Sequence, residues 1–149
     1  QLSANVRELL RDNLPTTQDL YPVNCANARF IPESEYTAGE RRFIGFARWL
    51  ADRCSLSTPT VTIVDAPGAS CEADSSCNGT RLRINRGCLG AAYFDRPRLA
   101  AWATLITHEL AHRTGNGHDP VFWMECERLG GEVAQTIYEH ASEMRQWGF

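Results

Sequence analysis

The chain has 149 residues, of which 43% are hydrophobic and 22% are charged, a balance typical of one globular domain. Its 15 basic and 18 acidic residues give a net charge of -3 without long runs of like charge. This balance argues against binding of nucleic acid or of an anionic membrane by the domain itself. No apolar stretch approaches the roughly 18 to 20 residues of a membrane span. We therefore expect one domain over residues 1–149, a monomer with no nucleic-acid and no membrane partner.

Helices and short strands alternate along the predicted chain. Apolar spacing and the signals for caps and turns predict helices over 5–11, 37–54, 95–113, 119–129 and 132–145, strands over 60–64 and 80–84, and a polar loop over 70–79. The two strands lie close in sequence, so we expect them to pair. The pattern indicates an α+β fold, compact and of a single domain, with a small, mainly antiparallel sheet packed on helices.

Three of the four histidines fall within eleven residues, at His108, His112 and His118. Side chains four residues apart on a helix lie one above the other, so the first two can direct a ring nitrogen at one point. His118 can join them if the chain reverses after the helix, and we expect Gly115 and Gly117 to allow this through positive φ. Three histidine ligands and one open position are typical of a catalytic zinc site. The sequence therefore predicts bound Zn²⁺.

Glu109 follows the first of these histidines directly. In a His-Glu-x-x-His helix the carboxylate lies beside the metal-bound water and can take a proton from it, with zinc lowering the pKa of that water to about 7. This arrangement predicts hydrolysis of a peptide bond, with Glu109 as general base and then acid. A blander interpretation, in which the histidines only cap the helix end, leaves Glu109 and His118 unexplained.

The string His108-Glu-Leu-Ala-His112, followed by His118-Asp-Pro-Val-Phe-Trp123, resembles the signature of the small metallopeptidases of the WLM, YgjP-like and SprT-like group. The resemblance extends over about residues 80–129. It implies a compact zincin fold in which the three histidines are the zinc ligands and Glu109 is the catalytic base. Residues 1–58 and the cysteines have no counterpart in that resemblance.

The same string fits the pattern HExxHxxGxxHD, which is similar to the metzincin signature with Gly115 at the turn. Metzincins also place a methionine turn beneath the zinc. Met124 falls inside the predicted helix that starts at Asp119, and Met144 falls in another helical pattern, so neither is expected to form such a turn. The metzincin fold is accordingly our second choice.

Other residues near the motif have interpretations that need no catalysis. Asp119 is either an N-cap or a hydrogen-bond partner of a ligand histidine. Phe122 and Trp123 are expected to pack in the core behind the third histidine. His140 is expected to be exposed or bonded locally.

Two further features could contact a substrate. Tyr93 and Tyr138 are candidates for stabilising an oxyanion, although each is more often a packed tyrosine. The strand over 80–85, just before the helix of the motif, is expected to offer its edge to an extended peptide.

Six cysteines are a high load for a cytoplasmic domain of this size and favour a secreted protein with disulfide bonds, the alternative being a cytoplasmic protein with reduced thiols. Cys71 and Cys77 flank the polar loop and could bridge it. Fifteen pairings of the six are possible, and the sequence does not choose among them.

Three functions remain open at the level of sequence. The first is a zinc endopeptidase that acts on an extended polypeptide. The second is a zinc-binding or toxin-like interaction module without catalysis, which Glu109 argues against because a structural site has no use for a carboxylate at an open position. The third is a DNA-associated protease of the SprT-like kind, which the acidic charge balance disfavours.

Overall fold

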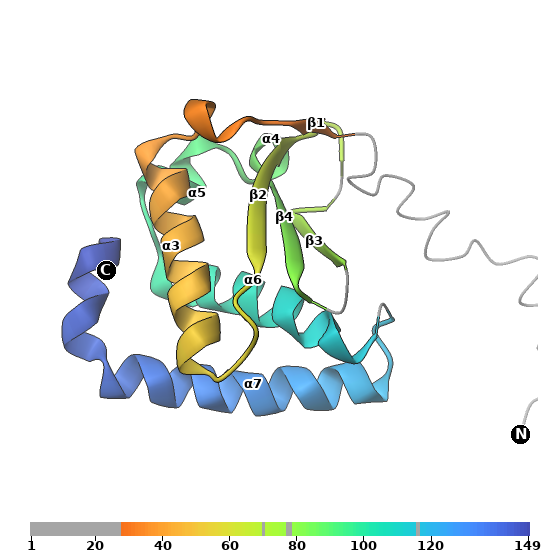
Figure 1. Cartoon of the computed structure of the whole chain (residues 1–149), viewed down its shortest axis with the longest axis vertical. Coiled ribbons are helices and arrows are strands. Elements are labelled where there is room, and N and C mark those ends of the chain that lie inside the picture. The colour runs from red at the N-terminus through yellow and green to blue at the C-terminus, as the bar shows by residue number, and fades with distance from the viewer. Residues whose placement is uncertain (1–27, 70, 77–78, 116) are drawn as a thin grey trace, which may run out of the picture.

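A computed structural model describes residues 28–69, 71–76, 79–115 and 117–149 (Figure 1). The helix predicted over 5–11, together with Cys25 and Cys77, lies outside these residues. In chain order the elements are β1 (Arg29–Phe30), η2 (Glu33–Glu35), α3 (Ala38–Arg53), β2 (Thr60–Asp65), β3 (Ala73–Ser76), β4 (Arg81–Asn85), α4 (Arg86–Leu89), α5 (Ala91–Asp95), α6 (Leu99–Ala111), η3 (His112–Thr114), α7 (Pro120–Glu139) and η4 (Ala141–Trp147). They form one compact α+β domain.

The four strands form a mixed sheet in the order β1-β2-β4-β3. The central pair, β2 and β4, is parallel, with Val61 opposite Leu82 and Ile63 opposite Ile84. The two outer pairs are antiparallel. The predicted strands therefore do pair, but the sheet is mixed because β3, which lies between them in sequence, is on the far side of β4.

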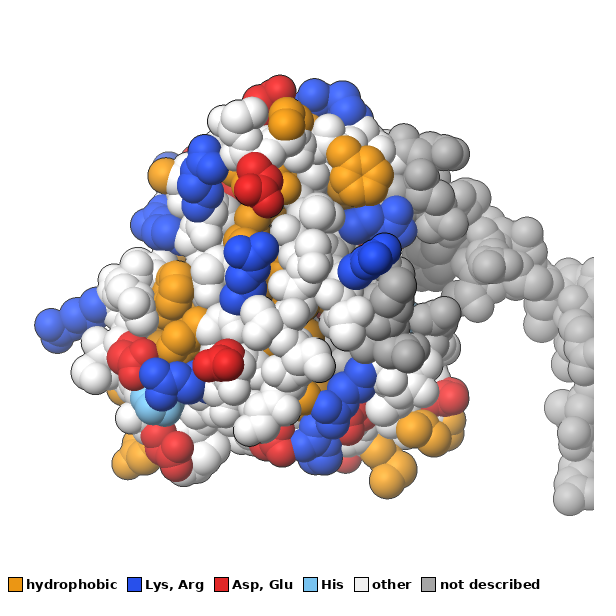
Figure 2. Space-filling model, viewed as in Figure 1, with side chains coloured by type: hydrophobic (Ala, Val, Ile, Leu, Met, Phe, Trp, Pro, Cys, Tyr) orange, Lys and Arg blue, Asp and Glu red, His pale blue; other side chains and the backbone are white. Residues whose placement is uncertain are grey.

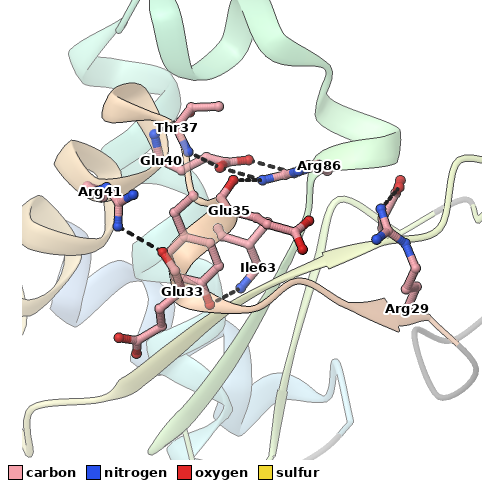
Figure 3. Close-up of polar contacts among 10 residues, drawn as sticks. Arg29, Glu33, Glu35, Thr37, Glu40, Arg41, Ile63 and Arg86 are labelled. Atoms are coloured by element: carbon pink, nitrogen blue, oxygen red, sulfur yellow. Dashed lines mark hydrogen bonds and ion pairs between the residues drawn. The ribbon is translucent and has the colours of Figure 1, made fainter.

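The helix predicted over 37–54 is confirmed as α3, and a capping box at its start also joins two parts of the fold (Figure 3). Glu40 is only 2% exposed, and its Oε2 accepts a hydrogen bond from the backbone N–H of Thr37 at 2.8 Å. The guanidinium of Arg86, the first residue of α4 directly after β4, donates to both oxygens of Glu40, at 2.8 Å and 2.6 Å. One buried carboxylate thus caps α3 and ties it to the sheet.

The core lies between one face of the sheet, α3 and α6. In Figure 1, α3 stands beside β2, while α6 passes below the strands and α7 runs beneath α6 in roughly the opposite direction. Phe43 of α3 and Trp102 of α6 pack edge to face, with ring centroids 5.1 Å apart. Buried residues of both helices and of the sheet share this core: Phe43, Phe46, Leu50, Ile63, Leu82, Ile84, Trp102 and Ile106. On its side away from the strands, α6 packs along α7 (Figure 1).

Three of the predicted elements differ from the structure in extent or type. Asp95 ends the short helix α5 rather than starting α6, because Arg96 has an extended φ of -119° that interrupts the helix. The predicted loop over 70–79 contains strand β3. The helix predicted over 119–129 and the first part of the one predicted over 132–145 form a single helix, α7, which continues through Gly130 and Gly131, and the rest of the second lies in η4. Buried Leu129 and Val133 on either side hold this part of α7 in the core, which outweighs the roughly 1 kcal/mol that each glycine costs a helix.

No disulfide bond joins any two of the four cysteines in the described residues, which are Cys54, Cys71, Cys88 and Cys126. Cys54 is buried beside Thr136, with its Sγ 3.7 Å from the threonine hydroxyl. The predicted bridge between Cys71 and Cys77 involves a residue outside the described ones. Within the described ranges, no helix combines the length and the apolar character needed to cross a membrane.

Candidate metal site

The last turn of α6 and the first residue of η3 carry the two histidines of the motif on one face, as their spacing predicts. The ring centroids of His108 and His112 lie 5.2 Å apart. The backbone carbonyl of Gly115 can only accept, so Nδ1–H of His112 donates to it at 3.1 Å. This hydrogen bond fixes the tautomer and leaves Nε2 of His112 as the ring atom available to a metal.

The third histidine reaches the same point because the chain reverses between α6 and α7. Gly115 has φ of +151°, which confirms the predicted role of this glycine, whereas Gly117 does not have a positive φ. After the turn, Asp119 caps α7 by accepting from the backbone N–H of Phe122 at 2.9 Å, and Pro120 is the first helical residue. The cap interpretation of Asp119 is thereby confirmed. His118 stands just before the cap, so the start of α7 determines where its ring lies.

These three histidines fit a divalent metal ion. Their candidate ligand atoms all lie within 4.8 Å of one another, and Nε2 of His118 is 3.2 Å from Nε2 of His108. Two nitrogens on one tetrahedral zinc, at 2.0 to 2.1 Å each, would lie about 3.3 Å apart. Burial lowers the pKa of both His108 and His112, and the neighbouring imidazoles lower it further, although for His112 the hydrogen bond to Gly115 acts in the opposite direction. The rings are thus kept in the neutral form that binds metals.

An aromatic side chain supports the histidines from behind. Phe122 is fully buried, and its ring lies 5.0 Å from His108, 4.6 Å from His112 and 4.7 Å from His118. Its predicted place in the core is confirmed. For Trp123 the same prediction is wrong, because this side chain is 52% exposed. Residues that are adjacent in the sequence of a helix lie on different faces of it, so Phe122 can be buried while Trp123 is exposed. The apolar character of Trp123 alone did not show which face carries it.

Glu109 lies beside the histidines, on the side facing the sheet. It is 3% exposed, and its Oε2 has no hydrogen-bond partner among the described residues. Burial raises the pKa of Glu109 to about 7, and the negative charge of Asp74 adds to this effect, while the nearby hydroxyl of Ser75 opposes it. A buried carboxylate without a partner is costly to a fold, so such a group points to chemistry rather than stability.

Strand β3 contributes residues that the sequence analysis did not identify. Ala73, Asp74 and Ser75 line a cavity of about 230 Å³ together with Glu109 and the histidines. Asp74 is held by Arg83 of β4, which donates to both carboxylate oxygens at 2.7 Å and 2.6 Å. No apolar alternation marks this strand, so only its backbone pairing with β4 could reveal it.

The prediction that the strand over 80–85 offers its edge to a peptide is wrong. That strand is β4, which pairs with β2 on one side and with β3 on the other. Among the described residues β3 pairs only with β4, so the open edge next to the histidines belongs to β3. The small cavity adjoins a larger one of about 890 Å³, which also reaches His108 and Glu109.

An ion pair joins the two sides of the histidine turn. Nε of Arg113, which follows His112, lies 2.6 Å from Oε1 of Glu125 on α7. Arg128 donates to both oxygens of Glu125, at 2.9 Å and 2.8 Å. Hydrogen bonds from Arg128, assisted by Arg113, lower the pKa of Glu125. The pair connects the chain after the second histidine to the helix that follows the third.

The remaining candidates lie apart from the histidines or have other partners. The hydroxyl of Tyr93 donates to the carbonyl of Ala101 at 3.2 Å, as expected of a packed tyrosine. Tyr138 is eighteen residues beyond the start of α7, about 27 Å along the helix, and is strongly exposed. Nδ1 of His140 lies 2.9 Å from Oε1 of Glu143, the predicted local contact.

The structure thus defines a class of site. Three histidines, on a helix and the turn after it, lie close enough to one another to hold a metal ion, and a buried glutamate lies beside them. No family model, curated protein or solved structure matches the chain. Met124 lies on α7 and is 69% exposed, and Met144 is buried in η4, so neither of the two methionines forms a turn beneath the histidines.

Proposed function

We propose that this protein is a zinc-dependent endopeptidase of the zincin type. The observation that carries the proposal is Glu109, a buried carboxylate with one oxygen that no described residue hydrogen-bonds, directly beside three convergent histidines. His108, His112 and His118 would hold the zinc ion. Three imidazole nitrogens suit zinc, and a three-ligand set leaves a coordination position for water or substrate.

Zinc bound there would supply a Lewis acid for the scissile carbonyl and a bound water of lowered pKa. The protein's own part in the reaction is proton transfer at Oε2 of Glu109. That atom has no competing hydrogen bond among the described residues, so it is free to accept a proton from the attacking water. The same atom then holds the proton for the leaving amine. Nδ1 of His112, bonded to Gly115, keeps its ring oriented throughout.

The substrate we propose is an extended polypeptide. The open edge of β3 offers backbone N–H and C=O groups to a peptide strand, and side chains of β3 line the cavity that contains the histidines. A peptide paired with that edge would pass its carbonyls over the histidines. The larger adjoining cavity gives the chain room to continue.

The competing interpretation is a zinc-binding module without catalysis. A structural zinc site is normally closed by four protein ligands, and here the described part of the chain offers three with a carboxylate beside them. For a DNA-associated role, a basic stripe would be needed. On the face in Figure 2, basic and acidic side chains are interspersed, and the net charge is -3.

The test compares the wild type with Glu109→Gln and, as a matched control, with Glu132→Gln on the exposed side of α7. We expect all three proteins to bind about one zinc ion, measured by metal analysis. The wild type and the control should cleave a peptide library, and Glu109→Gln should lose about 10²- to 10⁴-fold in kcat. A chelator should stop cleavage, and zinc should restore it. Bound zinc without cleavage by the wild type would favour the module, and full activity of Glu109→Gln would reject its role as base.

A further inference from the structure

A second depression borders the metal site, on the side of α6 away from the sheet. It is a cavity of about 390 Å³ between α6 and α7. Small side chains line both walls, namely Ala100 and Ala103 on α6 and Gly130 and Ala134 on α7. We call this cavity the interhelical groove. Small residues at their contact allow two helices to approach closely. These two helices nevertheless leave a groove of this volume between them, so it is unfilled space.

Gly130 shows that the groove is open rather than filled by neighbouring side chains. A Cβ placed at this position would meet no heavy atom within 4 Å, and its φ is not in the left-handed region. Neither packing nor backbone conformation therefore requires a glycine. Apart from His108, no charged or ionisable side chain except the thiol of Cys126 lines the groove among the described residues. Such a lining favours an apolar occupant and disfavours a charged one.

The groove adjoins the proposed catalytic site. His108 lines both the groove and the small cavity of the metal site. Trp123 lines the groove as well, and its ring centroid is 6.0 Å from that of His118. Three large apolar side chains are exposed where α7 begins, those of Val121, Trp123 and Met124, and orange side chains lie at the lower right in Figure 2 beside charged ones. If a carbonyl of a peptide substrate lay at the histidines, an apolar side chain one or two residues away along that peptide would therefore be buried in the groove.

We infer that the interhelical groove is a specificity subsite, which binds a bulky apolar side chain of the peptide substrate next to the bond that is cleaved. This inference rests on the proposed peptidase function. Adjacent residues of an extended chain are about 3.3 Å apart, so a residue beside the scissile bond reaches the part of the groove lined by His108. The volume of the groove accommodates a leucine, methionine or phenylalanine side chain.

The experiment fills the groove from a position where a side chain does not disturb the fold. Gly130→Leu places an isobutyl group in the groove, and Gly131→Leu is the control, since a Cβ there also meets nothing and faces a different cavity. Both changes add the same helix propensity. The probes are peptides that differ only in having phenylalanine, alanine or aspartate on either side of one peptide bond. Cleavage is measured as kcat/KM, and binding is measured by fluorescence anisotropy with zinc-loaded Glu109→Gln.

We expect the wild type to prefer the phenylalanine peptide over the alanine peptide by at least about tenfold. Gly130→Leu should abolish this preference with little effect on the alanine peptide, and Gly131→Leu should leave it intact. Cleavage by the wild type without apolar preference, or equal losses for both peptides in Gly130→Leu, would overturn the inference. A wild-type dimer that Gly130→Leu converts to a monomer would assign the groove to a second copy and also overturn it.

The binding measurement separates this inference from the proposed function. One outcome is that the wild type cleaves none of the peptides, while Glu109→Gln binds the phenylalanine peptide and loses this binding when Gly130→Leu is added. In that case the subsite stands and the peptidase proposal fails. If the three peptides bind equally, the subsite is rejected whatever the outcome for catalysis.

Discussion

Replacing Glu109 with glutamine should change how the stability of the metal-free protein depends on pH. Burial raises the pKa of Glu109 from 4.5 to about 7, with the charge of Asp74 as a second cause. The folded state therefore binds this proton more tightly than the unfolded state does. The carboxyl contributes stability that is fully present below pH 4.5 and is lost as the pH rises through about 7.

The expected size follows from the two pKa values. For a side chain that is 3% exposed, moving the pKa from 4.5 to about 7 changes the free energy of unfolding by about 2.5 kcal/mol between pH 5 and pH 8. Glutamine does not titrate. The stability of Glu109→Gln relative to the wild type should therefore improve by about that amount over this range, whatever the constant cost of a buried amide.

Urea denaturation followed by tryptophan fluorescence, at several pH values with a chelator present, measures this difference. Histidine titration is common to both proteins and cancels to a first approximation. Glu125→Gln is the control of opposite sign, because the pKa of Glu125 is lowered and its stabilising effect is lost only as the pH falls below 4.5. Its difference from the wild type should stay constant from pH 5 to 8. If the difference in the free energy of unfolding between Glu109→Gln and the wild type were also constant over this pH range, Glu109 would not be a buried carboxylate with a raised pKa.

Two further substitutions test how the site and the fold are held. Glu125→Gln weakens the link to Arg113 across the histidine turn, so it should lower zinc affinity in chelator competition by up to about tenfold, the smallest effect that loss of a direct hydrogen-bond partner of a ligand has in other metal sites. Glu132→Gln, in a more exposed ion pair of the same network, should leave the affinity unchanged. Equal zinc affinities for all three proteins would show that the link does not support the site. Glu40→Gln leaves the Arg86 guanidinium without its buried charged partner and should lower the free energy of unfolding, measured by urea denaturation, by about 3 kcal/mol. A loss of less than about 0.5 kcal/mol would show that this ion pair does not stabilise the fold.

Local features of the chain were predictable from residue patterns. The capping box at Thr37, the strands around Ile63 and Leu82, and the aspartate-proline start of α7 each depend on residues close in sequence. The convergence of His108 and His112 belongs to the same kind, since the helix itself determines a spacing of four residues. Here the backbone geometry of one element is sufficient to place the side chains.

Errors arose where a segment's conformation depends on distant partners. Strand β3 has no apolar pattern, and its backbone pairing with β4 makes it a strand. The continuity of α7 through Gly130 and Gly131 depends on core contacts of the residues on either side. Local propensity favoured a break at the glycines, and burial outweighed it.

From its residues alone, this protein could be assigned an α+β domain and three converging histidines on a helix and the turn after it, because helical periodicity and glycine conformations are local properties. Its folding in three dimensions established which strand has the open edge, which face of α7 exposes Trp123, and where the interhelical groove meets the histidines. These features depend on how surfaces far apart in the chain bury one another, and no short stretch of sequence contains that information.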